Sequence, residues 1–310
     1  MERSTFMVDR RGLPVELKLD RYRAVAKRTP NPLRMLRVGT CGFSYRDWVG
    51  PFYPLGIRPA SMLDYYAERF STVEIDSTYY AIPKPSMFES MAHRTPPDFR
   101  FTVKAPGSVT HVPADATPEE DDLIAFRACL DPLIRAGKLG AVLAQFPNSF
   151  RPARDAFGRL ELLRKEWPDL RLIAEFRHRD WQKESILRIL GALDIGWCNV
   201  DEPRFESLVK PDAQTTSTIG YIRFHGRNAA KWWKQERSSA ERYDYTYSTE
   251  ELVEWLPRIG EVIERTKETY VFFNNHRNGQ AATNARQMMD LLDIVPPSVD
   301  DAFRQLKLLE

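Results

Sequence analysis

Residues 73–80 read Val73-Glu74-Ile75-Asp76-Ser77-Thr78-Tyr79-Tyr80, a short β-prone run that passes into polar side chains. Period-two alternation along an extended chain places Glu74 and Asp76 on one face and Val73 and Ile75 on the other. The same pattern, a short β-prone run with polar residues at its end, recurs along the chain and predicts strands. We count eight such runs, at residues 35–39, 72–75, 99–104, 140–145, 171–176, 196–200, 220–224 and 269–273.

Amphipathic segments separate most of these runs, with apolar residues at the three- and four-residue spacing that is typical of helices. We expect helices at 60–70, 85–93, 118–136, 155–166, 183–193, 249–265 and 280–292. Pro85 and Pro118 suit helix starts, where a missing N–H costs little. The connection at 201–218 is poor in helix signals, and we expect it to be mostly loop.

Eight strand-then-helix units within 310 residues predict an α/β fold, a (β/α)8 TIM-type barrel that forms a single domain. An open doubly wound sheet fits less well, because the chain lacks the G-x-G-x-x-G turn of dinucleotide-binding folds. We place the barrel at residues 35–295, with an N-terminal extension at 1–34 and a C-terminal tail at 296–310.

The N-terminal extension is basic, with nine Lys and Arg residues against four Asp and Glu residues. It ends in Thr29-Pro30-Asn31-Pro32, two X-Pro steps that disfavour helix, and we expect it to be poorly ordered. A nucleic-acid-binding or targeting arm is the alternative. The whole chain has a formal charge of only +2, so its bulk charge does not point to nucleic acid.

The apolar stretches are far shorter than the roughly 18–20 residues that cross a bilayer, and the N-terminus lacks the apolar core of a signal peptide. Three cysteines without a CxxC spacing indicate neither a disulfide framework nor a thiolate zinc site. We therefore expect a soluble cytoplasmic protein without membrane association.

Catalytic residues of such barrels lie at the carboxyl ends of the strands, and every predicted strand here ends in polar groups. Glu74 and Glu175 form a possible carboxyl pair, one with its pKa raised by burial and the other held ionised by Arg177 or Arg223. His225 is a possible acid or base near neutral pH. These three residues are our catalytic candidates, although a structural ion-pair network would use the same side chains.

Basic side chains from several strands predict a site for a small anionic molecule, because guanidinium groups bind phosphate or carboxylate oxygens in bidentate fashion. The binding candidates are Lys104, Arg177, Arg223 and Arg227, with Asn274, Asn275, Tyr45 and Trp232 as polar and aromatic contributors. Alternation places Arg223, His225 and Arg227 on one face. The loop at 228–248 contains Trp232 and is long enough to form a lid, or a packed surface loop.

Several blocks of the chain resemble the YecE-like family, domain-of-unknown-function family 72. They include residues 39–45, 73–80, 99–106, Glu175-Phe176-Arg177-His178, 223–227 and Phe273-Asn274-Asn275-His276, in the family's order. The resemblance covers about residues 36–293 and implies a TIM-type barrel without implying a reaction. Where the family's block has Asn, this chain has Asp76, which adds a negative charge at the expected mouth of the barrel.

The leading hypothesis is an enzyme that acts on a small phosphorylated or carboxylated substrate by general acid–base hydrolysis or isomerisation. A non-catalytic protein that binds a nucleotide or single-stranded nucleic acid is the first alternative. A hydrolase or isomerase that depends on a divalent metal is the second, with Glu74, Asp76, Glu175, His225 and Asn274 as its ligand set. Arg177 and Arg223 would oppose a cation there, so we assign no metal ligand. The sequence identifies neither a particular cofactor nor an oligomeric state.

Overall fold

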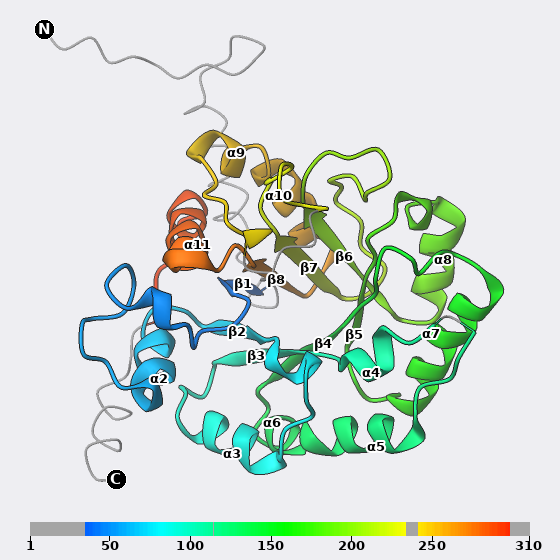
Figure 1. Ribbon diagram of the computed structural model, residues 1–310, viewed down its shortest axis with the longest axis horizontal. Helices are drawn as coiled ribbons and strands as arrows, with labels where there is room; N and C mark the ends of the chain where they lie inside the picture. The colour runs from blue at the N-terminus through cyan, green and yellow to red at the C-terminus, as the bar shows by residue number, and fades with distance from the viewer. Residues whose placement is uncertain (1–34, 114, 234–240, 298–310) are drawn as a thin grey trace, which may run out of the picture.

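The computed structural model describes residues 35–113, 115–233 and 241–297 (Figure 1). Eight parallel strands follow one another around a barrel in the order β1-β8-β7-β6-β5-β4-β3-β2. They are β1 (Met35–Thr40), β2 (Thr72–Ile75), β3 (Arg100–Lys104), β4 (Leu139–Gln145), β5 (Leu172–Glu175), β6 (Gly196–Asp201), β7 (Ile219–Phe224) and β8 (Glu268–Phe273). The predicted single-domain TIM-type barrel is confirmed.

The barrel closes between β1 and β2 through a short junction rather than a full ladder. The N–H of Gly42 donates to the backbone oxygen of Glu74 at 2.7 Å, and Cys41 and Glu74 form an isolated parallel bridge. Gly39 lies against β2, where a Cβ atom built on it would be 2.3 Å from the backbone oxygen of Thr72. Glycine at position 39 therefore allows the two strands to approach.

Helices surround the strands on the outside of the barrel (Figure 1). They are α2 (Met62–Ala67), α3 (Pro85–His93), α4 (Gly107–Thr110), α5 (Glu120–Cys129), α6 (Asp131–Arg135), α7 (Arg154–Glu166), α8 (Glu184–Ala192), α9 (Thr249–Val253), α10 (Leu256–Arg265) and α11 (Gln280–Leu291). The connection from β6 to β7 contains no helix, as its sequence predicted.

Two segments that we expected to be single helices are each divided in two. The 118–136 segment breaks at Leu130, between α5 and α6, where Pro132 lies in the first turn of α6. The 249–265 segment breaks between α9 and α10, with Pro257 in the first turn of α10. A proline lacks the N–H that a continuous helix needs and clashes with the carbonyl of the preceding turn.

Some of the segments that the sequence analysis delimits lie outside the described residues. These are the N-terminal extension at 1–34, most of the C-terminal tail at 296–310, and part of the loop at 228–248. Within the described ranges, no helix combines the length and the apolar composition that crossing a membrane requires.

Candidate functional site

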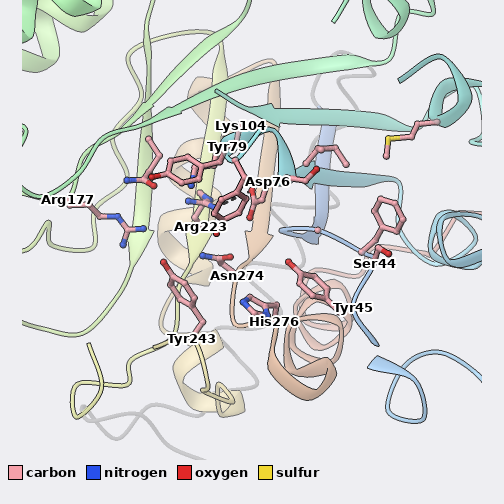
Figure 2. A pocket seen from close by; sticks show the side chains of 17 residues that line it. Ser44, Tyr45, Asp76, Tyr79, Lys104, Arg177, Arg223, Tyr243, Asn274 and His276 are labelled. Atoms are coloured by element: carbon pink, nitrogen blue, oxygen red, sulfur yellow. Dashed lines mark ion pairs between the residues drawn. The ribbon is translucent and has the colours of Figure 1, made fainter. Parts of the chain in front are cut away.

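A pocket of about 670 Å³ lies where the carboxyl ends of the strands and their following loops meet (Figure 2). Strands β3, β4 and β7 contribute Lys104, Gln145 and Arg223 to its lining. Segments that follow strands or lie in later loops add Ser44, Tyr45, Asp76, Tyr79, Arg177, Tyr243, Asn274 and His276. The pocket therefore lies at the end of the barrel where TIM-type enzymes have their active sites.

Arg223 is the central cation of the site, with only 1% of its side chain exposed. Its Nη1 atom is 2.5 Å from Oε2 of Glu175, and its Nη2 atom is 2.6 Å from Oε1 of Glu74. Nη2 also lies 3.4 Å from the Cys41 sulfur. One guanidinium group thus joins two fully buried carboxyl groups from opposite parts of the barrel, β2 and β5.

Glu175 is held ionised by its neighbours. Its Oε1 atom is 2.9 Å from Nε of Arg177, in addition to the pairing with Arg223. Burial by itself would raise the pKa of Glu175, but Arg177 and Arg223 outweigh it and bring the pKa well below its ordinary value. Arg177 also pairs through Nη1 with Glu202, at 2.8 Å.

Glu74 has the opposite character. Burial raises its pKa to about 8, and Asp76 adds to the rise, although Arg223 and the hydrogen bond from Tyr221 counteract part of it. The Tyr221 hydroxyl is 2.5 Å from Oε2 of Glu74 and 2.9 Å from the Thr102 hydroxyl. Burial therefore favours the protonated form of Glu74, while the neighbouring guanidinium groups favour the carboxylate form of Glu175, a division of states that acid–base chemistry uses.

His225 is fully buried, and it does not belong to the side chains that line the pocket. Burial lowers its pKa to about 3, and Arg177 contributes to the decrease, so the ring is neutral near pH 7. Nδ2 of Asn274 donates to Nδ1 at 3.0 Å, which leaves the proton of the neutral ring on Nε2. Nε2 lies 3.2 Å from Oε1 of Glu175.

Lys104 lies on the pocket wall with its Nζ atom 4.3 Å from the centre of the Tyr79 ring. Within the described residues, no carboxylate oxygen lies within 4.0 Å of this Nζ atom. Burial lowers the pKa of the nearby His111 to about 4, with Lys104 and Arg177 as further causes. The wall between β3 and β5 is therefore a region of positive potential.

Three sequence-based binding candidates lie outside the pocket lining. Arg227 pairs with Asp201 and Glu251, because Gly226, with a φ of 88°, turns the chain and ends the alternation that begins at Arg223. The expectation that Arg227 shares a face with Arg223 and His225 was wrong for this reason.

The other two candidates outside the lining are Asn275 and Trp232. Asn275 is buried and donates to the Tyr245 backbone oxygen and to Asn284. Trp232 is buried, with the Arg177 guanidinium 5.8 Å from the centre of its ring, and it does not line the pocket. Sequence reasoning did not select Tyr79, Gln145, Tyr243 or His276, which do line it. Gln145 ends a predicted strand, and Tyr79 and His276 each follow one, so position relative to strand ends was the signal that pointed to them.

The donor atoms of Cys41, Glu74 and Asp76 lie within 4.8 Å of one another, a geometry compatible with a metal ion. The chemistry of the surroundings opposes a cation, because the Arg223 guanidinium already contacts Glu74 and Cys41. Burial also raises the pKa of the Cys41 thiol well above its ordinary value, which disfavours the thiolate that binds metals.

Comparison with known proteins gives a consistent result. A family model described as "Protein of unknown function DUF72" matches residues 37–305. The chain is 32% identical to the UPF0759 protein YunF of Bacillus subtilis (strain 168), over 84% of this chain and 95% of YunF. The crystal structure of a DUF72 family protein from Thermotoga maritima MSB8 matches with a TM-score of 0.76 and 42% identity, covering 84% of this chain and 99% of that one. A DUF72 family protein from Enterococcus faecalis V583 matches with a TM-score of 0.74 and 28% identity, covering 86% of this chain and 100% of that chain.

Proposed function

The chain belongs to the DUF72 family, and we propose that it is an enzyme that acts on a small phosphorylated or carboxylated substrate by general acid–base hydrolysis or isomerisation. The reaction would take place in the pocket at the carboxyl end of the barrel. The observation that carries this proposal is the position of Arg223, which lines the pocket although only 1% of its side chain is exposed.

One polar atom of Arg223 lacks a hydrogen-bond partner among the described residues. Its Nε atom is buried and has no hydrogen-bond partner within the described part of the chain, whereas Nη1 and Nη2 bind Glu175 and Glu74. A buried donor without a partner is costly, and an anionic oxygen supplied by a ligand would satisfy it. Lys104 and Arg177 line the same pocket and complete a group of three cations, which we call the pocket cations.

The charges around the pocket favour an anion over a cation. Burial raises the pKa of Glu74 and of Glu202 to about 8, which favours the neutral form of both groups. Glu175, whose pKa is lowered, then remains as a counter-charge to the three pocket cations. The excess of positive charge would attract a phosphate or carboxylate group and orient the rest of the substrate toward the carboxyl groups.

The acid–base groups divide by their protonation states. Glu74, whose protonated form burial favours, would store the proton for the reaction, while the ionised Glu175 would hold Arg223 and Arg177 in the orientation that binds the anion. His225 is neutral and buried between Asn274 and Glu175, so its role would be to position these two groups rather than to contact the substrate.

Calorimetric titration with inorganic phosphate and with acetate tests the anion site in the full chain. We expect wild-type protein to bind phosphate, and Lys104→Gln to weaken binding roughly ten- to hundredfold, the effect of losing a charge-assisted hydrogen bond of about 1.5–3 kcal/mol. Lys165→Gln, at a side chain that is 80% exposed on α7, is the matched control and should bind as wild type does.

Turnover is tested by a screen of sugar phosphates, nucleotides and hydroxy acids for loss of substrate. In the titration, the anion site would be excluded if neither phosphate nor acetate bound to wild-type protein. It would also be excluded if the two ligands bound equally well to wild type and to Lys104→Gln. Binding of nucleotides without any turnover would instead favour the non-catalytic alternative.

A further inference from the structure

Asp76 is the carboxyl group that connects the buried ion network with the pocket. It follows β2 directly, lines the pocket, and has 25% of its side chain exposed, whereas the Glu74 side chain is completely buried. Figure 2 shows Asp76 beside Arg223 at the pocket wall. A proton held on Glu74 therefore has no direct path to a ligand, while one held on Asp76 does.

Three carboxyl groups share a single guanidinium at this point. Oδ1 of Asp76 is 3.9 Å from Nη2 of Arg223, the same atom that contacts Glu74 at 2.6 Å, while Nη1 is occupied by Glu175. Oδ1 is buried and has no hydrogen-bond partner within the described residues. Adjacent carboxylates repel each other when both are ionised, and a single proton between them relieves the repulsion.

The remaining groups near this pair do not supply the missing positive charge. Cys41 faces it as a buried thiol, and Tyr221 donates its hydroxyl proton to Glu74. The Tyr45 hydroxyl donates a hydrogen bond to the Cys41 backbone oxygen. Burial lowers the pKa of His276, which favours the neutral form of its ring. Among the described residues, Arg223 is therefore the cation that lies within 4.0 Å of the pair, while Lys104 lines the same pocket at a greater distance.

We propose that Glu74 and Asp76 share one proton, and that Asp76 is the catalytic residue that passes it to the substrate. This inference rests on the proposed function and assigns the acid of that reaction. In the step, an O–H bond of the pair breaks, a new O–H bond forms on a substrate oxygen, and the electron pair of the broken bond remains on the carboxylate. Arg223 then balances the charge that develops on Glu74 and Asp76.

Carbon-13 NMR of the labelled carboxyl groups tests the shared proton without any substrate. In the full chain, we expect Asp76→Asn to lower the pKa of Glu74 by about one unit or more, a tenfold or larger loss of proton affinity, because a neighbouring negative charge is removed. Asp47→Asn is the matched control: Asp47 is exposed and accepts from the backbone N–H of Asn278, and its removal should leave Glu74 unchanged. An identical Glu74 titration in wild type and Asp76→Asn would overturn the shared proton.

A second titration tests whether Asp76 contacts the ligand. Saturating inorganic phosphate should raise the pKa of the pair in wild type, because the bound anion adds negative charge beside Asp76, and should have a much smaller effect on Glu74 in Asp76→Asn. If phosphate binds and the pKa of the Glu74–Asp76 pair does not change, the proposal that Asp76 contacts the ligand is overturned. Phosphate that does not bind at all would instead count against the proposed function, and the NMR comparison of the variants would still decide on the shared proton.

Discussion

The Nη1 atom of Arg223 lies 2.5 Å from the Oε2 atom of Glu175, and both side chains are buried at the centre of the barrel. The same guanidinium reaches Glu74 on the far side through Nη2. Because neither carboxyl group has access to water, each depends on Arg223, and Arg223 depends on them. Most of the behaviour that we expect from the site follows from this arrangement.

Replacing Glu175 by alanine should strongly destabilise the fold. The change leaves Arg223 and Arg177 without their shared partner, and breaking a buried ion pair in this way costs about 3–5 kcal/mol. Chemical denaturation would measure the loss. Glu184→Ala removes an ion pair with Arg188 in which both side chains are mostly exposed, and it should cost less than about 1 kcal/mol. Similar losses for the two variants would contradict a buried network.

Replacing Glu74 by glutamine should change how stability depends on pH. Its pKa is raised from an ordinary value of 4.5 to about 8, so between these values the folded protein binds more protons than the unfolded chain. The free energy of unfolding then falls as the pH rises through this window, by an amount on the order of a few kcal/mol. Denaturation curves from pH 4.5 to 9 should show a flatter profile for Glu74→Gln than for wild type. Parallel profiles would rule out the raised pKa.

Replacing Tyr221 by phenylalanine should change both the pKa of Glu74 and the stability of the fold. The hydroxyl donates to Glu74, so its loss should raise the pKa of Glu74 further and cost about 1–3 kcal/mol, because a buried acceptor loses its partner. NMR titration and denaturation would measure the two effects. Tyr80→Phe, at a side chain that is 80% exposed, should change neither, and a shift of the same size in that variant would point to a non-specific cause.

The junction between β1 and β2 should be sensitive to side-chain volume. Gly39→Ala places a Cβ atom against the backbone of Thr72, and we expect a loss of about 1–3 kcal/mol, as for other overpacked positions. Gly158→Ala is the comparison: it lies on an exposed part of α7 with no neighbour within 4 Å of the added atom, and it should stabilise by about 0.5–1 kcal/mol. Thermal or chemical denaturation would separate the two. A neutral Gly39→Ala would show that the junction can widen.

Several parts of the site could be predicted from local pattern, and others could not. Alternation in the strands indicated that Glu74 and Arg223 point in the same direction as other polar groups, and both lie in the barrel interior. The pattern failed at Arg227, because it holds only while the chain is extended and Gly226 ends that conformation. Tyr243 gave no comparable signal, since it lies in a loop whose path depends on contacts with other parts of the barrel.

The sequence by itself determined the architecture, because strand and helix periodicities are local properties that each segment carries in its own residues. It also determined that polar groups gather at one end of the barrel. The tertiary structure alone decided which of them pair: Glu74 and Glu175 are far from Arg223 along the chain, yet both contact it. This packing shifts the pKa values of the two glutamates in opposite directions. A pKa depends on burial and on nearby charges from other strands, and the spacing of residues along the chain predicts neither.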